Sequence, residues 1–306
     1  MFKLRREQKI LKVGDVRIGG QPGELPTVLI GSILCRGRER NRGSARCKKK
    51  LERLIDYQEE MSDRTGLPFM LDIFAESIMV FREYIGFISE LTDAPFLING
   101  PNISVRLEMA DYCIEVGLLD RTVYNSISYE DTEEEVFTIG KSGLKAAIIQ
   151  SFNPRNPSPE GMIKILRGET CEKGLIRKAS KAGLEKLLVL TPGLEVPSIG
   201  YAVRTVYLAK KEFGMPVGTA AVGVVGGWKK ARRFGRNAEK VCRAGAAALA
   251  QAMGADFVMY GSIANAKDVF PVCAMIDSIV AYTAKTLGLK PLTKDHPLYR
   301  IFQDTR

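Results

Sequence analysis

The sequence predicts a single (β/α)8 barrel, the TIM-barrel fold, with an N-terminal β-hairpin in front of the first barrel strand. Eight short apolar runs recur along the 306 residues, as buried strands do. The stretches between them carry apolar residues at three-and-four spacing and end at glycine, as amphipathic helices do. Because eight alternations of strand and helix fit a closed barrel better than an open sheet, we expect residues 1–306 to form one barrel domain.

The hairpin is predicted from the stretch VGDVRIGGQPGELPTVLIGS, residues 13–32. A phosphate-binding glycine loop follows a strand and opens a helix, whereas these glycines come before a strand. We therefore interpret Gly14-Asp15 as a tight turn and Gly19 to Gly23 as a loop. Residues 1–26 would then precede the first strand and cover the bottom of the barrel.

The barrel strands follow in order along the chain. They are expected at TVLIGSIL from Thr27, LPFMLDIFA from Leu67, PFLIN from Pro95, TVYNSIS from Thr122, KAAIIQSF from Lys145, KLLVLT from Lys186, PVGTAA from Pro216 and DFVMYGSI from Asp256.

Composition excludes several kinds of chemistry. The only histidine is His296, and the six cysteines are scattered without a CxxC pair, so we predict no metal site, no disulfide framework and no histidine-based triad. Any reaction would depend on carboxylates, amides, hydroxyls or a cofactor. No apolar run has membrane-spanning length and the N-terminus lacks a signal-peptide stretch, so a cytoplasmic location is expected.

The net charge of +10 gathers in two segments, Arg36 to Lys50 and Trp228 to Lys240. Each segment is either an attraction site for an anionic partner or ligand, or simply a solvated surface. Nucleic acid is a weaker interpretation, because no recognised binding motif or aromatic stacking pattern accompanies the charge.

Catalytic residues of a TIM barrel lie at the carboxyl ends of its strands. The polar residues there are Asp72, Glu76, Asn99, Asn102, Asn125, Ser126, Gln150, Asn153, Thr191, Glu195, Tyr260 and Asn265. The excess of amides suggests a neutral ligand rich in heteroatoms, while Asp72 and Glu76 could instead form an acid–base pair. Each residue alone also fits a turn or a helix cap.

Several segments, in the same order and over nearly the whole chain, carry a family resemblance. They are GGQPGELPTVLIGS, PFLINGPNISVR, GLLDRTVYNSIS, EVPSIGYAVRTVYLAKKEFGMPVG and AMGADFVMYGSIANAKDVFP. Together they resemble the H subunit of tetrahydromethanopterin S-methyltransferase and the related methyl-tetrahydrofolate corrinoid methyltransferases.

The resemblance implies an enzyme that moves a methyl group between a tetrahydropterin substrate and the cobalt of a corrinoid carried by a partner protein. It also implies a homodimer and association with other subunits of a methyltransferase complex, and it allows a peripheral location at a membrane complex through those partners. No nucleic-acid partner and no direct membrane insertion are expected.

Carried over to this chain, the resemblance implies catalytic roles for Asn125 and Asp72. It implies pterin contacts from Asn99, Asn102, Asn125, Ser126, Gln150, Thr191 and Gly223. The match is partial: Asn99 stands where the family has Asp, Leu190 or Thr191 where it has an acid, and Gly223 near an expected Asn. Two lost carboxylates would weaken pterin binding, since each charge-assisted hydrogen bond contributes roughly 1.5 to 3 kcal/mol.

Two alternatives stay open on the sequence alone. The barrel could use a different methyl donor or acceptor while keeping a corrinoid partner. It could also be a non-catalytic binding partner of a corrinoid protein.

Overall fold

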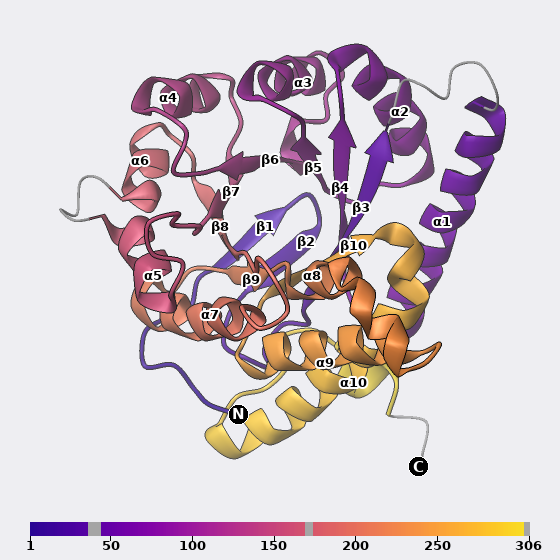
Figure 1. Cartoon of the computed structure of the whole chain (residues 1–306), viewed down its shortest axis with the longest axis vertical. Coiled ribbons are helices and arrows are strands. Elements are labelled where there is room, and N and C mark those ends of the chain that lie inside the picture. The colour runs from indigo at the N-terminus through magenta and orange to yellow at the C-terminus, as the bar shows by residue number, and fades with distance from the viewer. Residues whose placement is uncertain (36–43, 169–173, 303–306) are drawn as a thin grey trace.

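A computed structural model describes residues 1–35, 44–168 and 174–302 of the chain. Eight parallel strands close into a barrel in the order β10-β3-β4-β5-β6-β7-β8-β9, which confirms the predicted fold, and helices surround the ring (Figure 1). The strands are β3 (Val28–Cys35), β4 (Phe69–Ala75), β5 (Phe96–Asn99), β6 (Thr122–Ile127), β7 (Ala146–Gln150), β8 (Lys186–Thr191), β9 (Val217–Thr219) and β10 (Phe257–Ser262).

The helices begin and end largely where capping signals place them. Ser77 caps the start of α2, Thr132 and Glu135 form a capping box at α4, and Gly214 ends α7 in the left-handed conformation. The helices are α1 (Ser44–Thr65), α2 (Ile78–Leu91), α3 (Ile103–Glu115), α4 (Glu133–Lys141), α5 (Pro159–Arg167), α6 (Leu175–Lys181), α7 (Ile199–Phe213), α8 (Ala221–Gly227), α9 (Ala238–Ala252), α10 (Ala266–Ala284) and α11 (Pro297–Arg300). Among the described residues, no helix is both long enough and apolar enough to span a bilayer.

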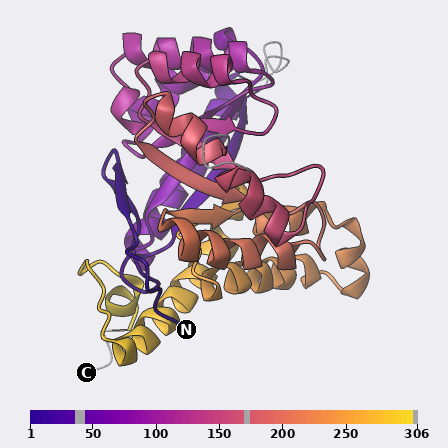
Figure 2. The same ribbon diagram turned by 90° about the vertical axis from the view of Figure 1, so that its left-hand side faces the viewer.

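The N-terminal hairpin closes one end of the barrel, as predicted. It consists of β1 (Ile10–Val13) and β2 (Val16–Gly19), with Gly14 at a φ of 51° in the turn. Val13 and Ile18 are fully buried against the inward-facing residues of the barrel strands. The hairpin stands on one side of the barrel in Figure 2, at the amino ends of the strands. The opposite end is therefore the one at which a ligand can enter the barrel.

Alternation along each strand separates an inner core from an outer one. Inward-facing residues such as Ile30, Met70 and Leu97 fill the barrel, while their neighbours in sequence pack against the helices. Toward the carboxyl ends of β3 to β7 the inward positions change from apolar to polar. That change forms the floor of the open mouth.

One predicted segment differs from the structure. The seventh barrel strand is predicted within PVGTAA from Pro216; β9 lies there but ends at Thr219, and residues 221–227, for which no helix is predicted, form α8. The Thr219 hydroxyl accepts a hydrogen bond from the Ala221 amide at 3.3 Å, which turns the chain out of the strand. Of the two basic segments, residues 36–43 lie outside the described part, and Trp228 to Lys240 forms a 3-10 helix, η3 (Lys229–Phe234), and the first turn of α9.

Candidate active site

Four neighbouring strands bring polar side chains together at the mouth of the barrel. Asp72 lies on β4, Ser32 beside it on β3, Asn99 on β5 and Asn125 on β6. Asp72 Oδ2 accepts a hydrogen bond from Ser32 Oγ at 2.9 Å. Its Oδ1 accepts from Asn99 Nδ2 at 3.1 Å and from Asn125 Nδ2 at 3.0 Å. We call these four residues the Asp72 cluster.

The carboxyl group at the centre of this cluster is almost completely shielded from water. The Asp72 side chain is buried, and burial raises the pKa of Asp72 above its ordinary value, because it removes water from the charged form. The hydrogen bonds from Ser32, Asn99 and Asn125 act in the opposite direction and lower the pKa. Because the effect of burial is the larger one, the Asp72 carboxyl group can hold a proton at a higher pH than an exposed aspartate. This property suits a proton donor.

The two asparagines are oriented by this carboxyl group. Each turns its amide nitrogen toward Asp72, so each amide oxygen is left to accept a hydrogen bond, and no described residue donates to either oxygen. The cluster therefore offers acceptors, in fixed positions, to the N–H groups of a ligand. Ser32 was not predicted as a site residue, although the alternation of Val28, Ile30 and Ser32 along the first barrel strand places it on the inner face.

The other predicted contacts divide between the mouth and the scaffold. Gln150 ends β7 on the inward side, and Ser126 follows Asn125 on β6. Gln150 and Ser126 are half-buried. Gly223 is exposed in α8. Asn102 caps α3 by accepting from the Val105 amide at 3.0 Å. Thr191 is fully buried in the barrel wall, where its hydroxyl donates to the Gly218 carbonyl at 3.2 Å.

Five further candidates lie apart from the Asp72 cluster. Tyr260 is buried on the outer side, where its hydroxyl donates to Gln58 Oε1 at 2.6 Å, and Asn153 Nδ2 donates to the Gly161 carbonyl at 3.0 Å. Glu76 and Glu195 are exposed, and Asn265 precedes α10. Asp72 is thus buried and Glu76 exposed, and the acid–base pairing of the two stays a prediction.

His296 has a structural position. It is buried at the start of α11, where Nδ1 accepts from the Leu298 amide at 3.1 Å, and burial lowers the pKa of His296 to about 4. Within the described ranges, no group of three or more histidine, cysteine or acidic side chains could hold a metal ion. The Asp72 cluster at the mouth consists of one carboxyl group, two amides and a hydroxyl.

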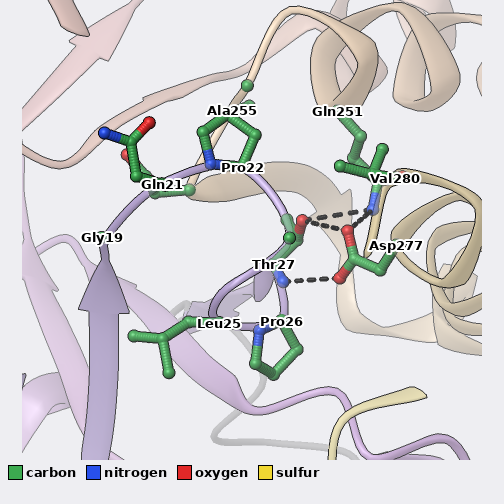
Figure 3. Close-up of a pocket in the computed structure, with 13 residues that line it drawn as sticks. Gly19, Gln21, Pro22, Leu25, Pro26, Thr27, Gln251, Ala255, Asp277 and Val280 are labelled. Carbon is green, nitrogen blue, oxygen red and sulfur yellow. Dashed lines mark hydrogen bonds between the residues drawn. The ribbon is translucent and has the colours of Figure 1, made fainter. Parts of the chain in front are cut away.

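A second buried carboxyl group lies at the closed end of the barrel (Figure 3). Asp277 of α10 accepts from the Thr27 amide at 2.6 Å, from the Thr27 hydroxyl at 2.7 Å and from Gln251 Nε2 at 2.6 Å. Burial raises the pKa of Asp277 to about 6, and the nearby charge of Asp256 adds to that rise. This network ties the start of β3 to α9 and α10, so we assign it to the scaffold.

The fold and the Asp72 cluster define a TIM-barrel protein with a group of hydrogen-bonded polar side chains at its open mouth. The family model for the tetrahydromethanopterin S-methyltransferase MtrH subunit matches residues 6–292. The chain belongs to this family.

Curated relatives cover almost the full length of the chain. The tetrahydromethanopterin S-methyltransferase H subunit of Methanothermobacter thermautotrophicus is 38% identical over 312 residues, which cover 98% of this chain and 100% of the relative. The H subunit of the putative methyltransferase mtx of Methanosarcina barkeri is 34% identical over 309 residues, covering 97% of this chain and 99% of that one.

Solved structures share the fold at low identity. A dihydropteroate synthase of Xanthomonas albilineans aligns with a TM-score of 0.57 at 14% identity, covering 92% of this chain and 98% of that one. A 3-deoxy-D-arabino-heptulosonate 7-phosphate synthase of Thermotoga maritima aligns with a TM-score of 0.56 at 12% identity, covering 93% and 95%. At such identities the likeness concerns the fold alone.

Proposed function

We propose that this protein is a methyltransferase that moves a methyl group between a tetrahydropterin and the cobalt of a corrinoid bound to a partner protein. The observation that carries the proposal is the buried Asp72 carboxyl group, held by Ser32, Asn99 and Asn125 at the mouth of a barrel of the MtrH family. The pterin is a substrate here, and the corrinoid belongs to the partner.

In the proposed direction, the bond between the methyl carbon and N5 of the pterin breaks as the electron pair of cobalt(I) forms a bond to that carbon. The bonding pair stays on N5, and an amine nitrogen with a developing negative charge is a poor leaving group. Asp72 would hold a proton close to N5 and transfer it to that nitrogen. Its raised pKa supports this role, since the proton remains bound above the ordinary range for aspartate.

The distribution of polarity around the mouth fits a flat ring with one hydrogen-bonding edge. Ser32, Asp72, Asn99 and Asn125 supply polar groups on β3 to β6, whereas Leu190 and Met259 present apolar side chains on β8 and β10. The amide oxygens of Asn99 and Asn125 would accept from ring N–H groups. Gln150, Ser126 and the open space at Gly223 complete the proposed contacts.

The position of Asp72 bears on the departure at Asn99. The resemblance implies an acid at residue 99, and the structure places a carboxyl oxygen of Asp72 3.1 Å from Asn99 Nδ2. A carboxyl group is thus still present next to residue 99. Leu190 and Gly223 carry no polar side chain themselves, and we infer weaker pterin contacts on that side.

The proposal also includes partners and a location. We propose that two copies of the chain associate, that they bind other subunits of a methyltransferase complex, and that they lie in the cytoplasm next to that complex. A face of α10 with exposed Met275, Ile279 and Tyr282 supports association of two copies, since large exposed apolar patches favour an interface. Sedimentation equilibrium tests this point, and a monomer at all concentrations would contradict it.

The experiment that tests the activity mixes the protein with methyl-tetrahydromethanopterin and free cob(I)alamin and follows the cobalt absorbance spectrum. We expect methylcobalamin to form, and Asp72→Asn to slow its formation by roughly 10²- to 10⁴-fold, as expected for loss of a proton donor. Calorimetric titration with the same pterin is the control for binding. Absence of both binding and transfer at about millimolar pterin would refute the proposal and direct the search to other methyl donors.

A further inference from the structure

Basic side chains gather on one part of the rim of the open mouth. They follow β9, β10 and β3, three adjacent strands of the ring, and the segment after β9 projects on the side of the barrel opposite the hairpin (Figure 2). We call the exposed members the basic rim: Lys49, Lys50, Lys229, Lys230, Arg233, Arg236 and Lys267. None of them forms an ion pair with a described residue, whereas neighbours such as Arg232 and Arg243 pair with Glu239.

Acidic side chains occupy the other side of the same mouth. Glu130, Glu133 and Glu134 follow β6 and are exposed. In the ring of eight strands, β6 lies four strands from β10 in either direction, so the acidic and basic parts of the rim face each other across the opening. The Glu135 side chain has a structural role, since it accepts a hydrogen bond from the Thr132 amide in the capping box of α4. Glu130 takes no part in this capping box. Three exposed glutamates therefore lie across the opening from the basic rim.

An apolar anchor lies in the middle of the basic rim. The Phe234 side chain is 76% exposed, and its ring lies 6.0 Å from that of Trp228, which is half-buried. Exposed aromatic residues with flanking arginine and lysine are typical of the centre of a protein–protein contact.

We propose that the basic rim docks an acidic surface of the protein that carries the methyl-accepting corrinoid, and that the acidic side of the mouth excludes the reversed orientation. This inference rests on the proposed function, since the acceptor has to reach the mouth for the methyl group to pass. Charge complementarity of this kind accelerates association and rejects wrong orientations. An anionic membrane fits less well, because a flat surface of one sign would meet Glu130, Glu133 and Glu134 on the same face.

The test compares two acceptors for one methyl donor. The first is free cob(I)alamin, and the second is the corrinoid-carrying subunit of a tetrahydromethanopterin S-methyltransferase, loaded with cobalamin and reduced to cobalt(I). The variant is Lys230→Glu with Arg233→Glu. The matched control is Arg5→Glu with Lys9→Glu, which makes the same charge change on exposed residues of the N-terminal segment, far from the mouth.

We expect the rim variant to lose about tenfold or more in kcat/KM with the protein-bound acceptor and to keep its rate with free cob(I)alamin. The control variant should behave as the unaltered protein with both acceptors. For the unaltered protein, kcat/KM with the protein-bound acceptor should fall as salt rises from about 50 to 300 mM.

Several results would overturn the inference. These are unchanged transfer to the protein-bound corrinoid by the rim variant, an equal loss in the control variant, or no transfer by the unaltered protein to that acceptor. The rim would be assigned to a membrane instead if the unaltered protein sediments with phosphatidylglycerol vesicles, the rim variant does not, and the rim variant still transfers methyl groups to the protein-bound corrinoid. If the unaltered protein also transfers no methyl group to free cob(I)alamin, the result would count against the proposed function itself.

Discussion

At the scale of single residues, the behaviour of the Asp72 cluster depends on how three neutral donors and burial act on one carboxyl group. Burial dominates and raises the pKa of Asp72, while Ser32, Asn99 and Asn125 each stabilise its anion. Ser32 is the only donor to Oδ2 among the described residues and contacts the side of the carboxyl group that the asparagines do not. It is thus a positioning residue whose removal leaves the two amides in place.

We expect Ser32→Ala to raise the pKa of Asp72 further and to slow methyl transfer, because one of three hydrogen bonds to the carboxylate is lost. A hydrogen bond to a charged group contributes roughly 1.5 to 3 kcal/mol, so the rate should fall by about tenfold to a hundredfold. The proton donor is active when protonated, so activity declines as pH rises through the pKa of Asp72, and the variant should show this decline at higher pH.

The measurement is the pH profile of kcat/KM with free cob(I)alamin. Ser32→Thr keeps a hydroxyl and should retain the profile of the unaltered protein. An unshifted profile in Ser32→Ala would show that the hydroxyl does not act through Asp72.

At the scale of elements, the hairpin of β1 and β2 is part of the barrel core. Ile18 is fully buried among the inward-facing residues of the strands, so we expect Ile18→Ala to lower the free energy of unfolding by about 2 to 5 kcal/mol. Ile10 of the same hairpin is 37% exposed and provides the control, with a smaller expected loss for Ile10→Ala. Urea unfolding followed by circular dichroism measures both; a loss for Ile18→Ala that is as small as the loss for Ile10→Ala would mean that the hairpin does not stabilise the barrel.

The elements were largely predictable because strands and helices differ in the period of their apolar residues. All eight barrel strands lie where the apolar runs predicted them. Residues 221–227 were not predicted as a helix, since AVGVVGG is apolar without a helical period and rich in glycine. Thr191 could not be distinguished from a ligand contact, because the direction of a side chain at a strand end depends on the register of neighbouring strands. Asn102 could not be distinguished either, because an asparagine after a strand fits both a helix cap and a ligand contact. The site roles of Asp72, Asn99 and Asn125 stay predictions.

At the scale of the whole molecule, the closed end of the barrel makes stability depend on pH. The pKa of Asp277 is about 6 in the folded protein and ordinarily 3.8, so the folded state binds this proton more tightly than the unfolded chain. Its contribution to stability is full below about pH 4 and is lost as pH rises through about 6.

We therefore expect the difference in free energy of unfolding between the unaltered protein and Asp277→Asn to change steadily between about pH 4 and pH 7, with the unaltered protein losing stability relative to the variant as pH rises. His296, whose lowered pKa acts in the opposite direction over the same range, is present in both proteins and cancels in the difference. Urea denaturation at several pH values measures both. Asp15→Asn, at an exposed turn, is the control and should follow the unaltered protein. Parallel curves for Asp277→Asn and the unaltered protein would contradict the assignment.

Because the hairpin closes the amino end of the barrel, ligands of the described barrel have to pass through the mouth at its other end. Under the proposed reaction, the small donor and the large acceptor protein have to use the same opening, and a protein seated on the rim would shut the donor inside. The pterin must then enter first and depart last. Steady-state kinetics would accordingly follow a compulsory order of substrate addition, and an excess of the corrinoid protein would slow turnover by blocking the route of the demethylated pterin.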